Sequence, residues 1–154
     1  KISYNTIESK LYGDLDYYLH YPAIYPVSRE ESKRTSIYGY RHDPFTKNKK
    51  FHEGDDFSSK IGVDVFSTAH GTVKTSKRYG SFGNYIEIDH GNGYITVYGH
   101  LSTRKVKKGQ KVIRGQKIGE VGNTGRSTAP HLHYEVQYNN KHLNPNKFYF
   151  ETES

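Results

Sequence analysis

The sequence predicts an all-β domain, an antiparallel β-sandwich or open barrel, preceded by a short N-terminal arm that can hold one helix. Its length of 154 residues suits a single domain. Only 32% of the residues are hydrophobic, but 15 Tyr and 7 Phe supply large side chains for a core, which disordered chains lack. From residue 37 onward, short β-branched and aromatic runs alternate with turn signals, the pattern of a sandwich or barrel.

Residues 1–28 are predicted to form the arm or linker, and residues 29–154 the domain itself. A short helix is expected over residues 5–11, with Thr6 as its N-terminal cap. Two prolines after it favour an extended passage into the domain. The chain contains no Met, so we interpret it as a mature or trimmed fragment.

A hairpin is predicted over residues 84–98, where two alternating runs flank the turn sequence His-Gly-Asn-Gly. Ile86 and Ile88 share one face of its first strand. On the same two-residue period, His100 is expected to end the second strand, on the side opposite Val97.

The second half of the chain supplies further turns. Two Gly-Gln-Lys units, beginning at Gly109 and Gly115, suit tight turns that each lead into a short strand. The basic residues between 104 and 117 are interpreted as a solvated face, because no aromatic residues for base stacking lie among them. The glycine-rich segment 122–130 is a loop, and Asn139-Asn140 is a predicted hairpin turn.

Composition excludes several classes of protein. The absence of Cys excludes zinc ribbons, disulfide scaffolds and cysteine nucleophiles. No run approaches the roughly 18 apolar residues of a membrane span. A net charge of +7 and a pI near 9.4 favour anionic partners such as nucleic acid, acidic lipid headgroups or a polyanionic cell wall, with simple solubility as the alternative.

Five residues with metal-binding side chains fall at spacings that suit one site: His52, Asp56, His100, His131 and His133. The last two stand two apart in a predicted strand and therefore share a face. Gly54 permits a bend that brings His52 and Asp56 round to one ion. Imidazole and carboxylate are the usual ligands of catalytic zinc, which takes three and leaves one position open. The remaining histidines are interpreted as background: His20, His42, His70, His90 and His142.

These residues stand in segments that occur in the same order in a known family. The strongest are Phe51-His-Glu-Gly-Asp-Asp-Phe57, Tyr98-Gly-His-Leu-Ser102, and the loop from Gly122 that leads into His131-Leu-His-Tyr-Glu135. From about Pro22 to Phe150 the chain resembles the lysostaphin/LytM-type zinc metalloendopeptidases, which cleave bacterial peptidoglycan. Departures from the family pattern are small: His70 stands where an acidic residue is common, and Ala129 where Gly is common.

The resemblance implies a zinc-dependent endopeptidase that cleaves peptide cross-links of peptidoglycan in an open active-site groove. It implies that His52, Asp56 and His133 hold one zinc ion, and that a zinc-activated water attacks the peptide with the help of His100 and His131. The sequence leaves open which of these two accepts the proton. It also leaves open whether the bond cut is D-alanyl-diaminopimelate or glycyl-glycine.

The resemblance further implies a working place in the bacterial cell envelope, periplasmic or extracellular. Peptidoglycan stems and cross-links are the expected partners, without nucleic acid, and a monomer is expected. Two other classes of protein fit the sequence less well. A non-catalytic peptidoglycan-binding or regulatory domain of the same fold requires a lost ligand, and all five positions are filled. A lipoyl- or biotinyl-type carrier requires a modifiable Lys, and Lys74 and Lys77 lack its usual neighbours.

Overall fold

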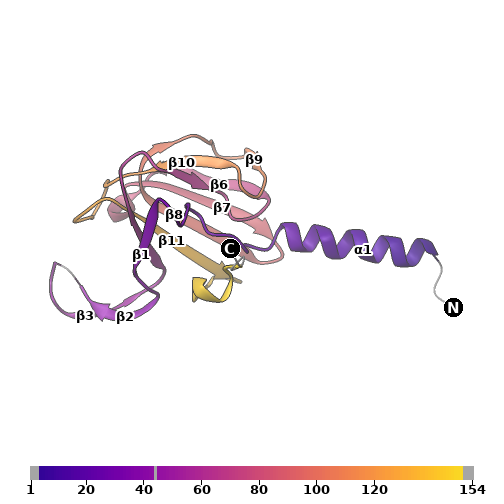
Figure 1. Cartoon of the computed structure of the whole chain (residues 1–154), viewed down its shortest axis with the longest axis horizontal. Helices are drawn as coiled ribbons and strands as arrows, with labels where there is room; N and C mark the ends of the chain where they lie inside the picture. Colours follow the sequence, from indigo (N-terminus) through magenta and orange to yellow (C-terminus); the bar gives the residue numbers. More distant parts are fainter. Residues whose placement is uncertain (1–3, 44, 151–154) are drawn as a thin grey trace.

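The computed structural model describes residues 4–43 and 45–150, and it shows one helix followed by a mostly antiparallel β-domain (Figure 1). The helix α1 spans Tyr4–Leu19. The strands in chain order are β1 (Ser32–Ser36), β2 (Gly39–His42), β3 (Lys49–His52), β4 (Asp55–Ser59), β5 (Asp64–Phe66), β6 (Gly71–Arg78), β7 (Asn84–Gly91), β8 (Tyr94–Arg104), β9 (Lys111–Val112), β10 (Lys117–Val121), β11 (His131–Tyr138) and β12 (Lys141–Leu143). Two 3-10 turns complete the set: η1 (Gly80–Phe82) and η2 (Pro145–Lys147).

One large antiparallel sheet forms the domain, and it does not close into a barrel. Its main path runs β1-β4-β11-β8-β7-β6-β9, and three further strands attach beside that path: β10 pairs with β5 and β8, and β12 pairs with β11. The β2–β3 hairpin is a separate two-stranded sheet. In Figure 1 this hairpin projects from one end of the molecule and α1 from the other. The predicted fold class, all-β with an open antiparallel sheet, is confirmed.

Buried apolar side chains form one core cluster. The predicted turns are also present. Ile86 and Ile88 are fully buried, as their shared face predicted. The β7–β8 turn has left-handed residues at Asn92 and Gly93, which Asn and Gly tolerate with little strain. Left-handed residues also form the β11–β12 turn, with φ of 48° and 65° at Asn139-Asn140. The core residues are Val27, Phe57, Val65, Val73, Ile86, Ile88, Tyr98, Leu101, Val106, Val112, Ile118, Val121, Leu132, Tyr134, Val136 and Phe148.

The N-terminal helix is longer than the predicted one. It begins at Tyr4 and continues to Leu19, so Thr6 lies inside the helix and its predicted role as cap is wrong. Apolar residues continue at helical spacing through Leu11 and Leu15, beyond the predicted segment, although both side chains are exposed. Within the described residues, no helix is long and apolar enough to span a membrane.

The segment after the helix packs against the domain. Ala23 and Val27 are each only 1% exposed. The Pro26 carbonyl accepts a hydrogen bond of 2.8 Å from the Phe66 N–H, and Val27 forms an isolated bridge with Val65. This passage therefore contributes core contacts. The division of the chain at residue 28 stays a prediction.

Strand β8 extends four residues further than predicted. His100 does not end it, because the strand continues to Arg104 by pairing with β10. His100 instead adopts a left-handed conformation with φ of 61°, close to a register shift in the pairing of β8 with β7. A bulge of this kind redirects a side chain without ending the strand.

A chain of buried polar groups lies inside the domain, and His90 is at its end. The His90 Nδ1 lies 2.8 Å from the His70 carbonyl, which can only accept, so Nδ1 carries the hydrogen. The neutral ring then offers Nε2 to the Thr96 hydroxyl, 2.7 Å away. That hydroxyl lies 2.9 Å from the Tyr98 hydroxyl, which in turn accepts from the Thr68 N–H. Burial lowers the pKa of His90 to about 4.

We expect His90 to contribute to acid sensitivity of folding. Its pKa is lower in the folded state than its ordinary value of 6.5, so the unfolded chain binds the proton more tightly. The stabilisation is therefore complete above about pH 6.5 and is lost as the pH falls towards about 4, an effect of about 3 kcal/mol. Urea unfolding at both pH values should show a smaller acid loss for His90→Gln than for the wild type. If the wild type and His90→Gln lose the same free energy of unfolding between the two pH values, His90 is not a source of the acid sensitivity.

Candidate metal centre

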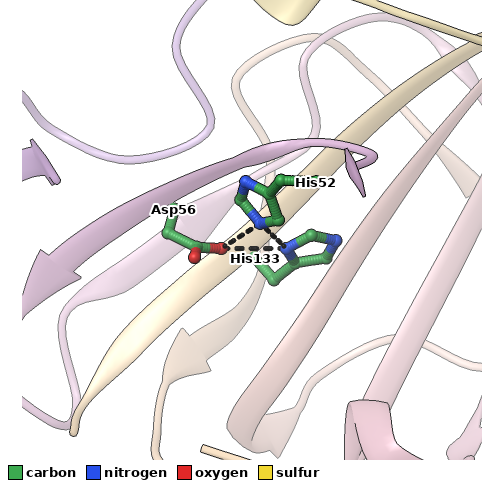
Figure 2. A group of neighbouring side chains, drawn as sticks. All are labelled: His52, Asp56 and His133. Carbon is green, nitrogen blue, oxygen red and sulfur yellow. Dashed lines mark hydrogen bonds and ion pairs between the residues drawn. The ribbon is translucent and has the colours of Figure 1, made fainter. Parts of the chain in front are cut away.

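His52, Asp56 and His133 meet at one point although they come from three strands (Figure 2). His52 is the last residue of β3, Asp56 lies in β4, and His133 lies in β11 directly opposite Asp56. The Asp56 Oδ1 is 2.8 Å from the His133 Nδ1 and 3.3 Å from the His52 Nε2. The two ring nitrogens are 3.3 Å apart. All three side chains are buried.

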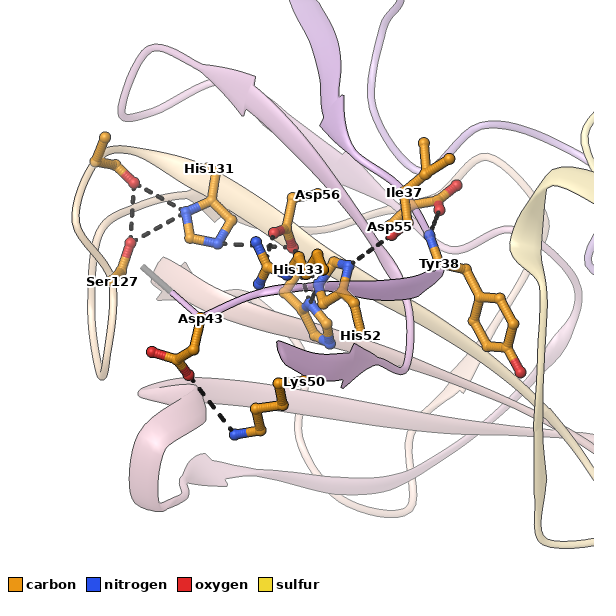
Figure 3. Close-up of polar contacts among 12 residues, drawn as sticks. Ile37, Tyr38, Asp43, Lys50, His52, Asp55, Asp56, Ser127, His131 and His133 are labelled. Carbon is orange, nitrogen blue, oxygen red and sulfur yellow. Dashed lines mark hydrogen bonds and ion pairs between the residues drawn. The ribbon is translucent and has the colours of Figure 1, made fainter. Parts of the chain in front are cut away.

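Hydrogen bonds on the outer side of each ring set its orientation. The His52 Nδ1 donates to the Ile37 carbonyl at 3.0 Å, as Figure 3 shows, so Nε2 faces the centre with a free lone pair. The His133 Nε2 bonds to the Glu135 Oε2 at 2.8 Å, so Nδ1 faces the centre. Such outer partners fix the tautomer of a metal-binding histidine.

Gly54 is needed for a different reason from the predicted one. Its φ is not left-handed, but a Cβ there would collide with the Tyr134 carbonyl oxygen on β11. The close approach of the backbones lets the chain pass from His52 into β4 directly beside β11. Both ligand-type side chains thereby reach the same point.

Two polar residues behind the centre were not identified from the sequence. Glu135 is 3% exposed, and besides His133 it contacts the His142 Nε2 at 2.9 Å. His142, interpreted above as background, also lies 3.4 Å from the Glu53 carboxylate. Glu135 could have been found, because residues two apart on a strand share a face. His142 could not, because its place depends on its pairing with Gln137 across the β11–β12 turn.

His100 and His131 lie beside the centre. Their ring centroids are 4.6 Å apart, and the His131 Nε2 lies 3.7 Å from the Asp56 Oδ1. The loop before β11 orients both rings: the Thr124 carbonyl accepts from the His100 Nδ1 at 2.8 Å, and the Ala129 carbonyl accepts from the His131 Nδ1 at 2.8 Å. Each ring therefore leaves its Nε2 free.

The charges of the centre follow from its contacts. Burial alone raises the pKa of Asp56, but hydrogen bonds from His133 and His52 outweigh it and hold that pKa well below its usual range. Burial lowers the pKa of His133, but hydrogen bonds to Asp56 and Glu135 outweigh this and raise it to about 9. His133 therefore carries a proton in the absence of a metal, and a bound cation would displace that proton. Burial lowers the pKa of His100 to about 4, so that ring is neutral at neutral pH.

A groove of about 340 Å³ opens over the centre. Ser81-Phe82 and the loop around residues 126–129 line it. Another part of the lining comes from the β2–β3 hairpin, whose Asp43 and Lys50 appear in Figure 3. The Arg126 Nη2 lies 3.2 Å from the Asp43 Oδ1, so an ion pair connects the hairpin to the loop before β11.

The chemistry of the donor set fits a divalent metal. His52, Asp56 and His133 offer two ring nitrogens and a carboxylate oxygen that all lie within 4.8 Å of one another. Two histidines and one carboxylate match catalytic zinc, which leaves a fourth position open. In the part of the chain that the structure describes, one other group could hold an ion: Glu53, Glu135 and His142. Its Glu135 is already bonded to His133 and His142.

A buried His-Asp-His set with two further histidines and a groove above it is an arrangement of groups that suits metal-assisted hydrolysis. The chain belongs to peptidase family M23, whose family profile matches residues 50–145. The recognised resemblance to lysostaphin-type peptidases is therefore confirmed.

Curated relatives and solved structures agree with this family. The chain is 45% identical over 123 residues to the peptidoglycan DD-endopeptidase ShyA of Vibrio cholerae, covering 80% of this chain and 29% of that protein. A solved zinc-containing peptidase from Vibrio cholerae is 42% identical with a TM-score of 0.72, covering 79% and 39%. The catalytic domain of lysostaphin from Staphylococcus simulans is 34% identical with a TM-score of 0.68, covering 76% and 91%. The chain spans less than a third of the length of ShyA.

Proposed function

We propose that the chain is a zinc-dependent endopeptidase that cleaves peptide cross-links of bacterial peptidoglycan. One observation carries the proposal: a buried His-Asp-His donor set lies at the floor of an open groove and is flanked by two more histidines. The open groove suits a cross-linked mesh that cannot enter a deep pocket. Relatives named as peptidoglycan DD-endopeptidases support the substrate class.

His52, Asp56 and His133 are the proposed zinc ligands, through the His52 Nε2, an Asp56 carboxylate oxygen and the His133 Nδ1. When bound, zinc supplies Lewis acidity, which polarises a peptide carbonyl and makes water more acidic. The ligand side chains are buried and held by outer hydrogen bonds, so they need little reorganisation to bind an ion.

His100 and His131 are the proposed catalytic residues. A neutral ring with a free Nε2 can accept a proton from water and later return it to the leaving amine. His100 is neutral at neutral pH and its Nδ1 is engaged by the Thr124 carbonyl, so its Nε2 is the accepting atom. The His131 Nδ1 donates to the Ala129 carbonyl, so its Nε2, 3.7 Å from the Asp56 Oδ1, has an N–H to donate only when the ring is protonated. In that form it would stabilise negative charge on the peptide oxygen. We therefore assign proton acceptance to His100 and oxyanion stabilisation to His131.

We further propose that residues 29–154 are the peptidase domain and that residues 1–28 link or anchor it. The place of action is the cell envelope, periplasmic or extracellular, because that is where peptidoglycan lies. A monomer is the proposed working form of the domain.

Digestion of purified peptidoglycan tests the function directly. Mass spectrometry should detect new peptide fragments that disappear with a chelator and return with added zinc. Directly cross-linked and glycine-bridged peptidoglycan are tested side by side, and the fragment masses identify the bond. Binding to peptidoglycan without fragments from either source would instead identify a non-catalytic binding domain of the same fold.

Removal of zinc is expected to lower the thermal stability of the protein. An ion that binds only the folded state stabilises it by an amount that grows with the free ion concentration, about 4 kcal/mol at a thousand times the Kd. Differential scanning calorimetry with zinc and with a chelator measures the shift. A melting temperature that zinc leaves unchanged is incompatible with a native zinc site.

Glu135 is a positioning residue in this proposal, because it orients His133 without facing the groove. Glu135→Gln is expected to weaken zinc binding by roughly 10–100-fold, the usual cost of losing an outer partner of a metal-binding histidine. Competition with a fluorescent chelator measures the zinc Kd. Glu53→Gln is the matched control, since Glu53 contacts His142 but not His133. Similar zinc Kd values for the two variants would refute the role.

A further inference from the structure

A second polar hollow lies beyond the groove, and its central residue is Arg104 at the end of β8. Neutral groups hold the guanidinium: Nε donates to the Asn84 Oδ1 at 3.3 Å, and Nη1 donates to the Ser76 hydroxyl at 3.2 Å. The Asn84 amide NH₂ is itself engaged with the Leu101 carbonyl at 3.0 Å, which turns Oδ1 towards Arg104. The arginine is thus oriented without a carboxylate partner among the described residues.

The hollow around Arg104 has a volume of about 410 Å³ and a cationic lining. Lys107 and Lys108 line it with Arg104, and the other lining residues are uncharged: Ser76, Asn84, Ser102, Thr103 and Val106. The acidic Glu120 on neighbouring β10 is paired with Lys117 at 3.0 Å. In the described part of the chain, neither lysine of the hollow has an acidic group within 4.0 Å. Its three positive charges are therefore uncompensated.

The positive charge of the whole chain is concentrated in this part of the sequence. Residues 71–117 contain ten Lys or Arg and two Asp or Glu, a net charge of +8. The remaining residues contain thirteen basic and fourteen acidic side chains, a net charge of −1. If the positive charge served only solubility, the basic residues would not need to be concentrated in one segment of the sequence. Some of this charge is offset in space, since Lys117 pairs with Asp64 and Glu120, but among the described residues the three cations of the hollow are not.

The hollow and the candidate active site lie along the same strand, β8, but share no lining residue. Ser102 and Arg104 follow His100 by two and four residues, which places them roughly 7 and 13 Å further along the strand. Asn84 follows directly on η1 and Gly83, beside the groove wall formed by Ser81-Phe82. A polymer that leaves the groove along this strand has the hollow within roughly 13 Å of His100.

We propose that this hollow is a second binding site for carboxylate groups of the peptidoglycan peptides. It binds a stem next to the one being cut and keeps the protein on its insoluble substrate. The proposal rests on the proposed function for the identity of the polymer. Arginine suits this ligand because its planar donors match a carboxylate in two parallel hydrogen bonds.

Binding to insoluble peptidoglycan tests the proposal. Zinc is removed by a chelator so that nothing is cut, and the bound fraction is measured by sedimentation on sacculi freed of phosphate polymers. The triple variant Arg104→Gln, Lys107→Gln, Lys108→Gln is expected to bind about tenfold more weakly, because charge-assisted hydrogen bonds are lost. The matched control Lys33→Gln, Lys60→Gln, Lys141→Gln loses the same charge at exposed positions outside the hollow and should bind as the wild type does. Melting curves verify that both variants fold.

Two further measurements separate the ligand chemistry from general attraction. Sacculi whose carboxylates have been amidated should no longer distinguish the hollow variant from the wild type. If both triple variants bind sacculi equally weakly, the proposal is overturned, because net charge alone then explains the binding. In another outcome, the wild type binds more tightly than the hollow variant to phosphatidylglycerol vesicles while the two proteins bind sacculi equally. That result overturns the proposal and identifies phosphate as the ligand. Cleavage of a short soluble cross-linked peptide tests the proposed function separately, since such a peptide does not extend to the hollow.

Discussion

Replacing His133 with alanine is expected to abolish both zinc binding and peptidoglycan hydrolysis, and Asp56→Ala is expected to do the same. His133 lies at the middle of the donor set, with its Nδ1 within 3.3 Å of both other ligand atoms. An outer partner of a ligand already contributes roughly 10–100-fold to affinity, so loss of a ligand itself should cost more than 100-fold. Metal content after dialysis and release of fragments from sacculi give the two readouts.

Removing either residue also leaves its buried neighbours without their partner, so folding must be checked independently. Asp56→Asn keeps the shape of the side chain and most of its hydrogen bonds while removing the charge, and it should lose zinc without unfolding. Retention of stoichiometric zinc by a folded His133→Ala or Asp56→Asn protein would show that the ion lies elsewhere. The group Glu53, Glu135 and His142 would then be the alternative position.

His100→Ala and His131→Ala are expected to separate binding from chemistry. Neither residue belongs to the donor set, so both variants should retain one zinc ion. Their turnover should fall by roughly 10²–10⁴-fold, the usual contribution of a positioned acid–base group. Single-turnover hydrolysis of a soluble cross-linked peptide, with zinc content measured on the same sample, gives both values.

A histidine outside the groove provides the comparison for these variants. His20 lies near His70, with ring centroids 5.4 Å apart, and it does not line the groove. His20→Ala should therefore hydrolyse the peptide at the wild-type rate. Full turnover by His100→Ala would show that the proposed division between ligands and catalytic residues is wrong. Loss of zinc from it would place His100 among the ligands instead.

Local features of the chain predicted much of this fold. The hairpin around Asn92-Gly93 and the turn at Asn139-Asn140 depend on left-handed residues that few side chains other than Gly and Asn adopt easily. The alternation of Ile86 and Ile88 depends only on the two-residue period of a strand. Both kinds of signal lie within a few residues, so a single sequence contains them.

Features that depend on distant pairing could not be predicted in this way. Asp55, adjacent to Asp56, is fully buried and accepts hydrogen bonds from the Tyr149 hydroxyl at 2.8 Å and the Tyr38 N–H at 2.9 Å. Nothing local to Asp55 indicates a partner 94 residues away. The ion pair between Asp43 and Arg126 connects two loops that are likewise distant in the chain. The continuation of β8 past His100 required its pairing with β10.

The register of β4 against β11 has a consequence for how the metal centre arises during folding. Asp56 and His133 are direct cross-strand partners although 77 residues separate them in the chain. A slip of one residue would turn one of the two side chains to the opposite face of the sheet. The partly folded chain therefore holds no assembled centre, and the ion is captured only once the central strands have paired correctly. Zinc uptake during refolding is therefore expected to report the pairing of β4 with β11, which joins residues 77 apart in the chain.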